Sequence, residues 1–178
     1  LGQPVATAAT PASSGKFPSL SLRAPSFKGA PDAINPPEIA DLMRHVREVE
    51  ETGDLDQLNA VKARIWLDGP LGAEGRVEGE ARRLFLDMNG IALRLAADTK
   101  AEIETAPAYR RLDQIAMPTL AISGDLDFPF IQDRSRHIAE TVRNGSHHEA
   151  SGTAHLPSLE RPAEITELLA SFISTNRA

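Results

Sequence analysis

The sequence predicts an α/β protein in which mostly parallel strands are flanked by helices and a helical segment is inserted. Two observations carry this prediction. In the last third of the chain, apolar strand candidates alternate with amphipathic helix candidates through short links, which is typical of parallel strands joined by crossovers. From residue 37 to about 104, apolar residues instead recur at helical spacing.

Residues 1–35 combine one helix candidate with one strand candidate. Residues 3–10 are small and mildly apolar, with a proline suited to a first helical turn. Near 19–23 leucines alternate with serines, which indicates a short strand. Residues 26–37 are rich in proline, glycine, aspartate and asparagine, so we expect a hinge there.

Residues 36–108 are predicted to form an inserted, all-helical unit. A Pro-Pro pair starts its first helix, and a Thr-Gly-Asp sequence ends it. Asp54 or Asp56 is expected to cap a second helix. A third helical stretch covers about 77–95, and Gly90 is expected to weaken or break it.

Residues 109–178 return to the alternating pattern. We expect a buried strand near 118–123, an amphipathic helix over 129–142 and a weaker strand near 145–150. The last helix carries the apolar stripe of a helix packed on a sheet: Ile165, Leu168, Leu169, Phe172 and Ile173.

The composition argues against several classes of protein. The formal net charge is -6 and the basic residues form no cluster, which argues against nucleic acid or an anionic membrane as partner. There is no cysteine, so no disulfide or thiolate metal site can form. We find no membrane-spanning apolar run and no signal peptide, and we expect a soluble, cytoplasmic protein.

Two titratable residues follow neighbouring strand candidates. Asp127 comes after the strand near 118–123, and His155 after the strand near 145–150. Loops at the carboxyl ends of parallel strands meet at one edge of the sheet and carry the functional residues of such folds. A carboxylate that binds one ring nitrogen fixes the tautomer of a histidine and stabilises its protonated form. We therefore expect Asp127 to orient His155 as a general base.

The same two loops resemble motifs of the α/β-hydrolase fold superfamily, specifically its cap-bearing members that act on small molecules. MPTLAISGDLDFP is similar to the family's Pro-Thr-Leu strand with Gly-x-x-Asp, and GTAHLPSLERP to its Gly-x-x-His-x-x-x-x-Glu-x-Pro ending. The resemblance implies that Asp127 is the acid, with Asp125 less favoured, and that His155 is the base. The family's strand before the cap is similar to FPSLSLRAPSFKG, and one of its cap segments to RIWLDGP, so the likeness spans nearly the whole chain. The resemblance implies that residues 36–108 are the cap.

The sequence differs from that family at the nucleophile. The family's nucleophile lies in a Gly-x-Ser-x-Gly turn between a strand and a helix, and the 178 residues contain no such motif. LGQPVATAAT resembles the family's segment directly after the serine, so that Leu1 and Gly2 would complete the turn. We expect the chain to be the C-terminal part of a hydrolase, lacking the nucleophile and the N-terminal half of the fold, and inactive alone.

Other residues with reactive side chains fit a functional role less well. His147, His148 and Glu149 suggest a metal, but adjacent side chains in a strand point to opposite faces, so no metal site is expected. Ser13 and Ser14 precede a strand, whereas a nucleophile turn leads from a strand into a helix.

The helical residues with rings or sulfur admit two interpretations. Trp66, Phe85 and Met88 fit the wall of a substrate pocket, although such helical stripes more often pack in a core. His45 and His137 lie on charged helix candidates and are expected to be exposed.

The resemblance implies hydrolysis of an ester, lactone or related acyl substrate by a Ser-His-Asp mechanism, without a metal or organic cofactor. Two alternatives stay open: a non-catalytic binding module of the same fold, and, if the nucleophile is an aspartate, a dehalogenase or epoxide hydrolase. The expected partners are a small-molecule substrate and the missing half of the fold, with a homo-oligomer also open.

Overall fold

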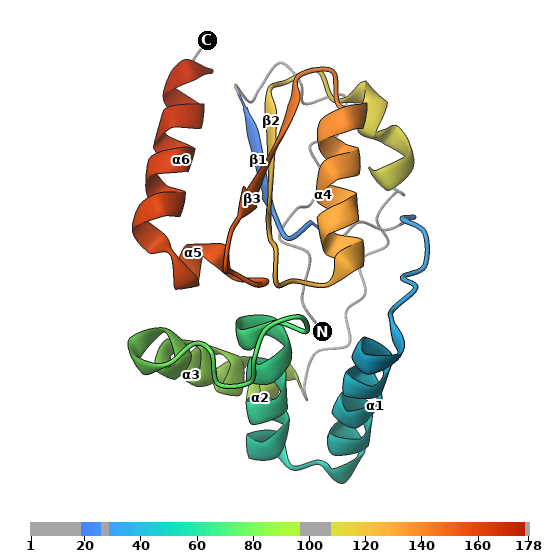
Figure 1. Cartoon of the computed structure of the whole chain (residues 1–178), viewed down its shortest axis with the longest axis vertical. Helices are drawn as coiled ribbons and strands as arrows, with labels where there is room; N and C mark the ends of the chain where they lie inside the picture. Colours follow the sequence, from blue (N-terminus) through green and yellow to red (C-terminus); the bar gives the residue numbers. More distant parts are fainter. Residues whose placement is uncertain (1–18, 26–28, 97–107, 177–178) are drawn as a thin grey trace.

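A three-stranded parallel sheet organises the structure, a computed structural model that describes residues 19–25, 29–96 and 108–176 (Figure 1). The sheet order is β1-β2-β3. The strands are β1 (Leu20–Arg23), β2 (Thr119–Gly124) and β3 (Gly145–Ala150). Both strand pairs are parallel, which confirms the α/β class and the parallel pairing predicted from the sequence.

The helices divide between an inserted group and the flanks of the sheet. The inserted group is α1 (Pro37–Thr52), α2 (Leu55–Ala63), the π-helical turn η2 (Arg64–Asp68) and α3 (Gly79–Ala96). The remaining helices are the 3-10 helix η3 (Ala108–Gln114), α4 (Pro129–Thr141), α5 (Pro157–Glu160) and α6 (Pro162–Thr175). Within the described ranges, no helix is both long and apolar enough to cross a bilayer.

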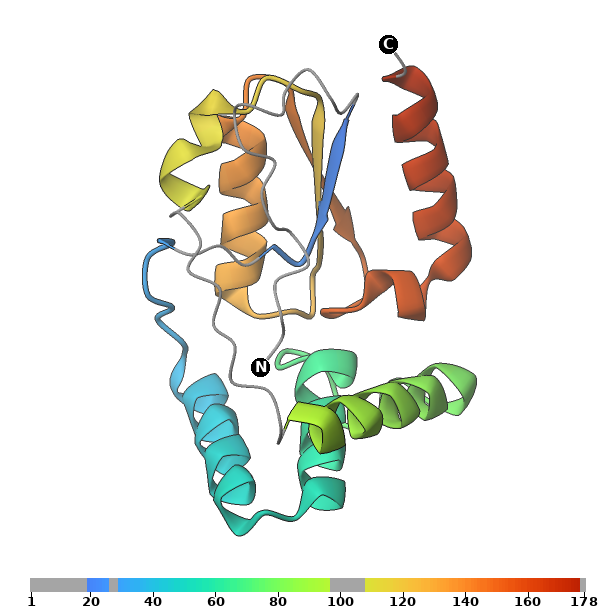
Figure 2. The ribbon, with the colours of Figure 1, turned by 180° about the vertical axis from the view of Figure 1, so that it is seen from behind.

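Strand β2 is buried along its whole length because helices cover both faces of the sheet (Figures 1 and 2). Ala121 points to the face covered by α4 and η3, where it packs with Leu22, Leu112, Ile138 and Val142. Leu120 and Ile122 point to the opposite face, where they pack against Ile165 of α6. This alternation follows from the two-residue period of a strand and explains why the apolar run of β2 is continuous.

The inserted helices, here called the helical unit (residues 37–96), lie beyond the carboxyl ends of the strands (Figures 1 and 2). One core joins the unit to the sheet layer, since Ile39, Val46 and Leu58 share it with Phe128 and Ile131. This core fills the space next to the loop that follows β2. The helical unit is therefore packed against the end of the sheet where functional residues were expected.

Local capping explains where α2 begins. The Asp54 side chain accepts hydrogen bonds from the backbone of Asp56 and Gln57, at 3.1 and 2.9 Å, so Asp54 caps α2. The sequence left the choice between Asp54 and Asp56 open, and the geometry decides it.

The structure corrects the expected break in α3 and excludes one of the two interpretations of Met88. Gly90 does not break the helix, which runs from Gly79 to Ala96. A Cβ at Gly90 would lie 3.0 Å from the side chain of Asn59, so the glycine permits α2 and α3 to approach each other. Met88 is not a core residue, because 63% of it is exposed. The division into residues 1–35, 36–108 and 109–178 stays a prediction.

Helix α6 offers a matched pair of isoleucines for testing this packing. Ile165 is 1% exposed in the core under the sheet, and Ile173 on the same helix is 45% exposed. We expect Ile165→Ala to lower the free energy of unfolding by about 2–5 kcal/mol, since it opens a cavity. Ile173→Ala should change it by about 0.5 kcal/mol or less. Urea unfolding followed by circular dichroism measures both, and equal losses would contradict this assignment of the core.

Candidate active site

The structure brings His155 and Asp127 together at the carboxyl ends of adjacent strands. Asp127 lies in the loop after β2, and His155 in the loop after β3. The Nδ1 atom of His155 is 2.9 Å from Oδ2 of Asp127. Parallel pairing of β2 with β3 starts both loops at the same edge of the sheet, which places the two side chains side by side.

Asp127 is fully buried, so its carboxylate depends on hydrogen bonds from the protein. The Phe128 backbone N–H donates to Oδ1 at 2.8 Å, and His155 contacts Oδ2. The Gln132 side chain donates to the Asp127 carbonyl at 2.9 Å and to the Asp125 carbonyl at 3.1 Å, which ties the loop to α4. Both carboxylate oxygens therefore have partners within the protein.

The two loops pack backbone against backbone. A Cβ on Gly124, at the end of β2, would lie only 2.1 Å from the Thr153 carbonyl oxygen and 2.4 Å from that of Ala154. The Leu126 N–H donates to the Thr153 carbonyl at 3.0 Å. Only a glycine fits at position 124, because any side chain would push the histidine loop away.

The contact with Asp127 sets the chemistry of the His155 ring. An ionised carboxylate only accepts hydrogen bonds, so Nδ1 carries the proton and the neutral ring keeps a lone pair on Nε2. The His155 side chain is 20% exposed, so the ring is partly open to solvent. The pair can thus take a proton at Nε2 and return it, with Asp127 stabilising the charged ring.

Trp66 of the π-helical turn lies against the histidine. Its ring centroid is 4.6 Å from that of His155 and 5.3 Å from that of Phe128. Trp66 is half-buried, whereas Phe85 belongs to a core cluster with Leu67. Of the three ring and sulfur residues considered from the sequence, only Trp66 touches the candidate site.

Asp125 supports the histidine loop and does not contact the ring in the described structure. Its Oδ1 accepts from the Gly152 N–H at 2.7 Å, and its Oδ2 from the Ser151 hydroxyl at 3.2 Å. The two carboxylates of Gly-Asp-Leu-Asp therefore have different partners: Asp125 binds the backbone of the histidine loop, and Asp127 binds the imidazole.

The remaining histidines lie away from this pair. His147 bonds the Ser123 hydroxyl at 2.9 Å on one face of the sheet, and His148 lies 3.7 Å from Glu164 of α6 on the other. Burial, and next the nearby charge of Arg136, lower the pKa of His147 below its usual value. This arrangement separates the two rings, as expected for neighbours in a strand.

The expectation that His45 and His137 are both exposed is half right. The side chain of His45 is 52% exposed on α1. His137 is instead half-buried, because its ring stacks on Tyr109 of η3 at 5.0 Å. Ser13, Ser14, Leu1 and Gly2 lie outside the described residues.

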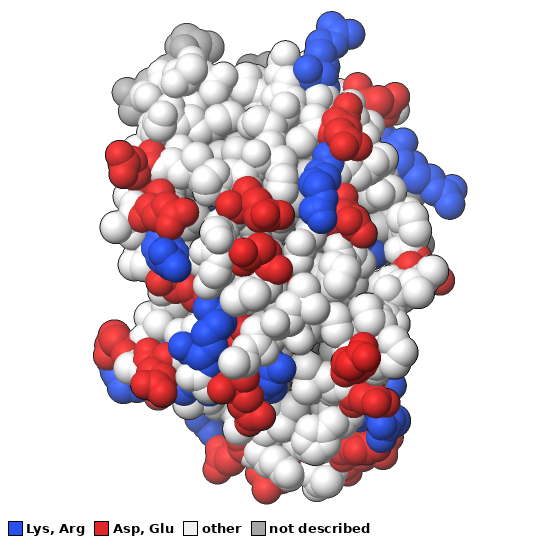
Figure 3. Space-filling model, viewed as in Figure 1, with Lys and Arg blue, Asp and Glu red and all other residues white. Residues whose placement is uncertain are grey.

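The surface carries charges of both signs. In the view of Figure 3, basic and acidic side chains are interspersed over the sheet layer and the helical unit. Several of these charges pair along one helix, as Arg44 does with Asp41 at 2.8 Å and Glu48 at 3.1 Å.

Comparison with known proteins identifies the fold to which the chain is similar. No protein-family model and no curated protein sequence matches the chain. Among solved structures, MenH from S. aureus matches with a TM-score of 0.63 and 14% identity, over 91% of this chain and 60% of that one. MGS-M2, an alpha/beta hydrolase enzyme from a Medee basin deep-sea metagenome library, matches with a TM-score of 0.59 and 19% identity, over 94% and 62%. The carboxylesterase CesB from Bacillus subtilis matches with a TM-score of 0.56 and 15% identity, over 89% and 52%.

These likenesses confirm the predicted fold class. The matches cover about nine tenths of this chain, which has the α/β-hydrolase fold, and the chain spans about three fifths of the length of MenH and MGS-M2. At such low sequence identity the comparison supports the shared fold alone, so the chemistry has to be derived from the residues of the site.

The role of Asp125 can be tested against a second aspartate. We expect Asp125→Ala to lower the free energy of unfolding by about 1.5–3 kcal/mol, because it leaves the Gly152 N–H without its charged acceptor. The Gly152 amide should also exchange faster in hydrogen-exchange NMR. Asp125→Asn should recover part of both losses, since its carbonyl oxygen can still accept.

Asp133 on α4 is the control, since its side chain pairs with the exposed Arg136 at 3.4 Å on the same helix. Asp133→Ala should change the free energy of unfolding by about 0.5 kcal/mol or less. An unchanged Gly152 amide in Asp125→Ala would contradict the role of Asp125 as a support of the loop.

Proposed function

With the α/β-hydrolase fold as the premise, we propose that the protein hydrolyses an ester, lactone or related acyl substrate by a Ser-His-Asp mechanism. The observation that carries the proposal is the 2.9 Å contact between Nδ1 of His155 and the fully buried carboxylate of Asp127. A buried orienting carboxylate and a partly exposed imidazole are the arrangement that a general base requires.

The proposed reaction has two halves. First, Nε2 of His155 takes the proton of a serine hydroxyl as its oxygen attacks the substrate carbonyl, and then gives that proton to the leaving alcohol. This step leaves an acyl-enzyme ester. Second, His155 takes a proton from water, whose oxygen attacks the acyl carbon, and returns the proton to the serine. Asp127 stays ionised throughout and stabilises the positive charge that His155 carries in each transition state.

The proposal requires a nucleophile that meets Nε2 of His155. The 178 residues contain no Gly-x-Ser-x-Gly motif, so we place the serine in a part of the protein outside this sequence. The structures matched by this chain extend well beyond the region it covers, which leaves room for such a segment in the same fold. This placement is part of the proposal and is tested with it.

The side chains near His155 favour an acyl substrate with an apolar group. Trp66 is half-buried and lies against the imidazole, with its ring centroid 4.6 Å from that of His155, whereas Phe128 behind it is buried in the core. Aromatic rings bind apolar groups and exclude water from the reacting atoms. CesB, one of the matched structures, is a carboxylesterase by its name, and we propose the same broad substrate class here without naming a substrate.

Labelling with a serine-reactive fluorophosphonate tests the proposal directly. The full-length protein should gain one phosphonyl group by mass spectrometry, on the proposed serine nucleophile. We expect His155→Ala to slow labelling about 100- to 10,000-fold, because it removes the base. Asp127→Asn should slow it by a similar factor, since the ring then loses its preferred tautomer.

His45→Ala is the matched control, since that histidine is exposed on α1 and should leave the labelling rate unchanged. Labelling of His155→Ala at the wild-type rate would refute His155 as the base. A wild-type protein that takes no label would refute the serine mechanism as a whole.

A further inference from the structure

Arg76, in the loop between η2 and α3, connects the helical unit to the histidine loop. Its Nη1 donates to the Gly152 carbonyl at 2.8 Å, and its Nη2 donates to the Leu67 carbonyl at 2.8 Å. Its Nε donates to the Asp68 carbonyl at 2.9 Å. The guanidinium thus holds backbone oxygens of two segments that are far apart in the sequence, and it is largely buried between them, with 21% of the side chain exposed.

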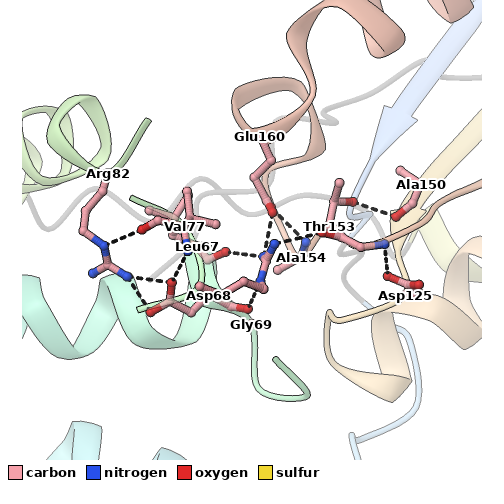
Figure 4. Close-up of polar contacts among 12 residues, drawn as sticks. Leu67, Asp68, Gly69, Val77, Arg82, Asp125, Ala150, Thr153, Ala154 and Glu160 are labelled. Atoms are coloured by element: carbon pink, nitrogen blue, oxygen red, sulfur yellow. Dashed lines mark hydrogen bonds and ion pairs between the residues drawn. The ribbon is translucent and has the colours of Figure 1, made fainter. Parts of the chain in front are cut away.

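Glu160 of α5 extends this connection to the residue next to His155. Its Oε2 pairs with Nη2 of Arg76 at 2.6 Å, and its Oε1 accepts from the Ala154 N–H at 2.8 Å (Figure 4). The Glu160 side chain is 3% exposed, so both oxygens are held within the protein. Arg76 therefore acts on the histidine loop twice, directly at Gly152 and through Glu160 at Ala154.

The helical unit anchors the other end of the connection. Asp68 is fully buried and accepts from Arg82 at 2.6 Å (Figure 4). It also accepts from the Gly75 N–H at 2.8 Å. Burial alone would raise the pKa of Asp68, but the hydrogen bonds from Arg82, Gly75 and Val77 lower it below its usual value, so the carboxyl is ionised at neutral pH. These bonds close the loop that carries Arg76 onto the end of η2.

We propose that Arg76 is a positioning residue for His155, which makes the alignment of the imidazole depend on the docking of the helical unit. This proposal rests on the function proposed above. The imidazole must keep Nδ1 on Asp127 while Nε2 faces the reacting oxygen, and a displacement of about 1 Å in such a group can cost on the order of 100-fold in rate. Arg76 binds the Gly152 carbonyl directly and reaches the Ala154 N–H through Glu160. Both backbone groups lie in the loop that carries His155.

Arginine suits this role better than lysine would. Its planar fork donates in fixed directions and here reaches four acceptors on three segments, whereas an ammonium group is a compact point charge. Arg76→Lys therefore keeps the charge and removes the geometry. Arg83→Lys is the control, because Arg83 is an arginine of the same helical unit whose bonds stay within α3, to Glu80 and Asp87.

The first measurement is independent of turnover. In the full-length protein labelled with ¹⁵N-histidine, the Nδ1–H signal of His155 is assigned by its loss in His155→Ala. We expect the exchange of this proton with water to rise at least about tenfold in Arg76→Lys, as the loop opens more often. In Arg83→Lys it should stay within about twofold of the wild type.

The second measurement is the rate of fluorophosphonate labelling. In Arg76→Lys the maximal rate should fall about 10- to 100-fold, while the probe concentration that gives half the maximal rate stays unchanged. If Arg76→Lys does not fold, Glu160→Gln replaces it, since glutamine offers one acceptor oxygen where Glu160 uses two, and the same changes are expected at smaller size.

Each outcome has one meaning. Wild-type behaviour of Arg76→Lys, or of a folded Glu160→Gln standing in for it, overturns the role of Arg76. Equal losses in Arg83→Lys also overturn it, because the effect would then not depend on the contacts that Arg76 makes with the histidine loop. A wild-type protein that takes no label refutes the proposed hydrolysis, and the Nδ1–H exchange still decides whether Arg76 positions the ring.

Discussion

The buried carboxylate of Asp127 is the constraint on which the arrangement of this site depends. An ionised group without solvent is tolerated only where hydrogen bonds replace water. The Phe128 amide satisfies one oxygen and the His155 ring satisfies the other. The second bond requires the loops after β2 and β3 to meet, which the parallel pairing of these strands and the glycine at position 124 permit.

The helical unit completes this arrangement and is not an independent appendage. Its core continues into Phe128 and Ile131, so the acid loop packs directly on it. Its polar contacts reach the histidine loop through Arg76 and Glu160. A change in how the helical unit packs would therefore affect both residues of the pair. Asp127 is affected through the apolar packing of its loop, and His155 through the hydrogen bonds to the backbone of its loop.

Much of the fold could be predicted because it rests on local periodicity. The apolar run of β2 and the apolar stripe on α6 each indicate which faces of these elements are buried. The loops with Asp127 and His155 follow their strands in the order that parallel pairing requires. Side-chain exposure was predicted less well, since His137 is covered by Tyr109 from a 3-10 helix that has no apolar period. Gly90 looked like a break because a propensity does not show that α2 lies against α3.

By itself, the sequence determined the class of fold, the strand order along the chain and the two residues whose loops meet, because these depend on patterns a few residues long. Only the tertiary structure decided that Asp54 caps α2, that Asp125 supports a loop, and that Arg76 reaches Glu160, 84 residues away. Such contacts leave no periodic signal. They form when segments that are distant in sequence are packed together, and their polar groups must find partners once water is excluded.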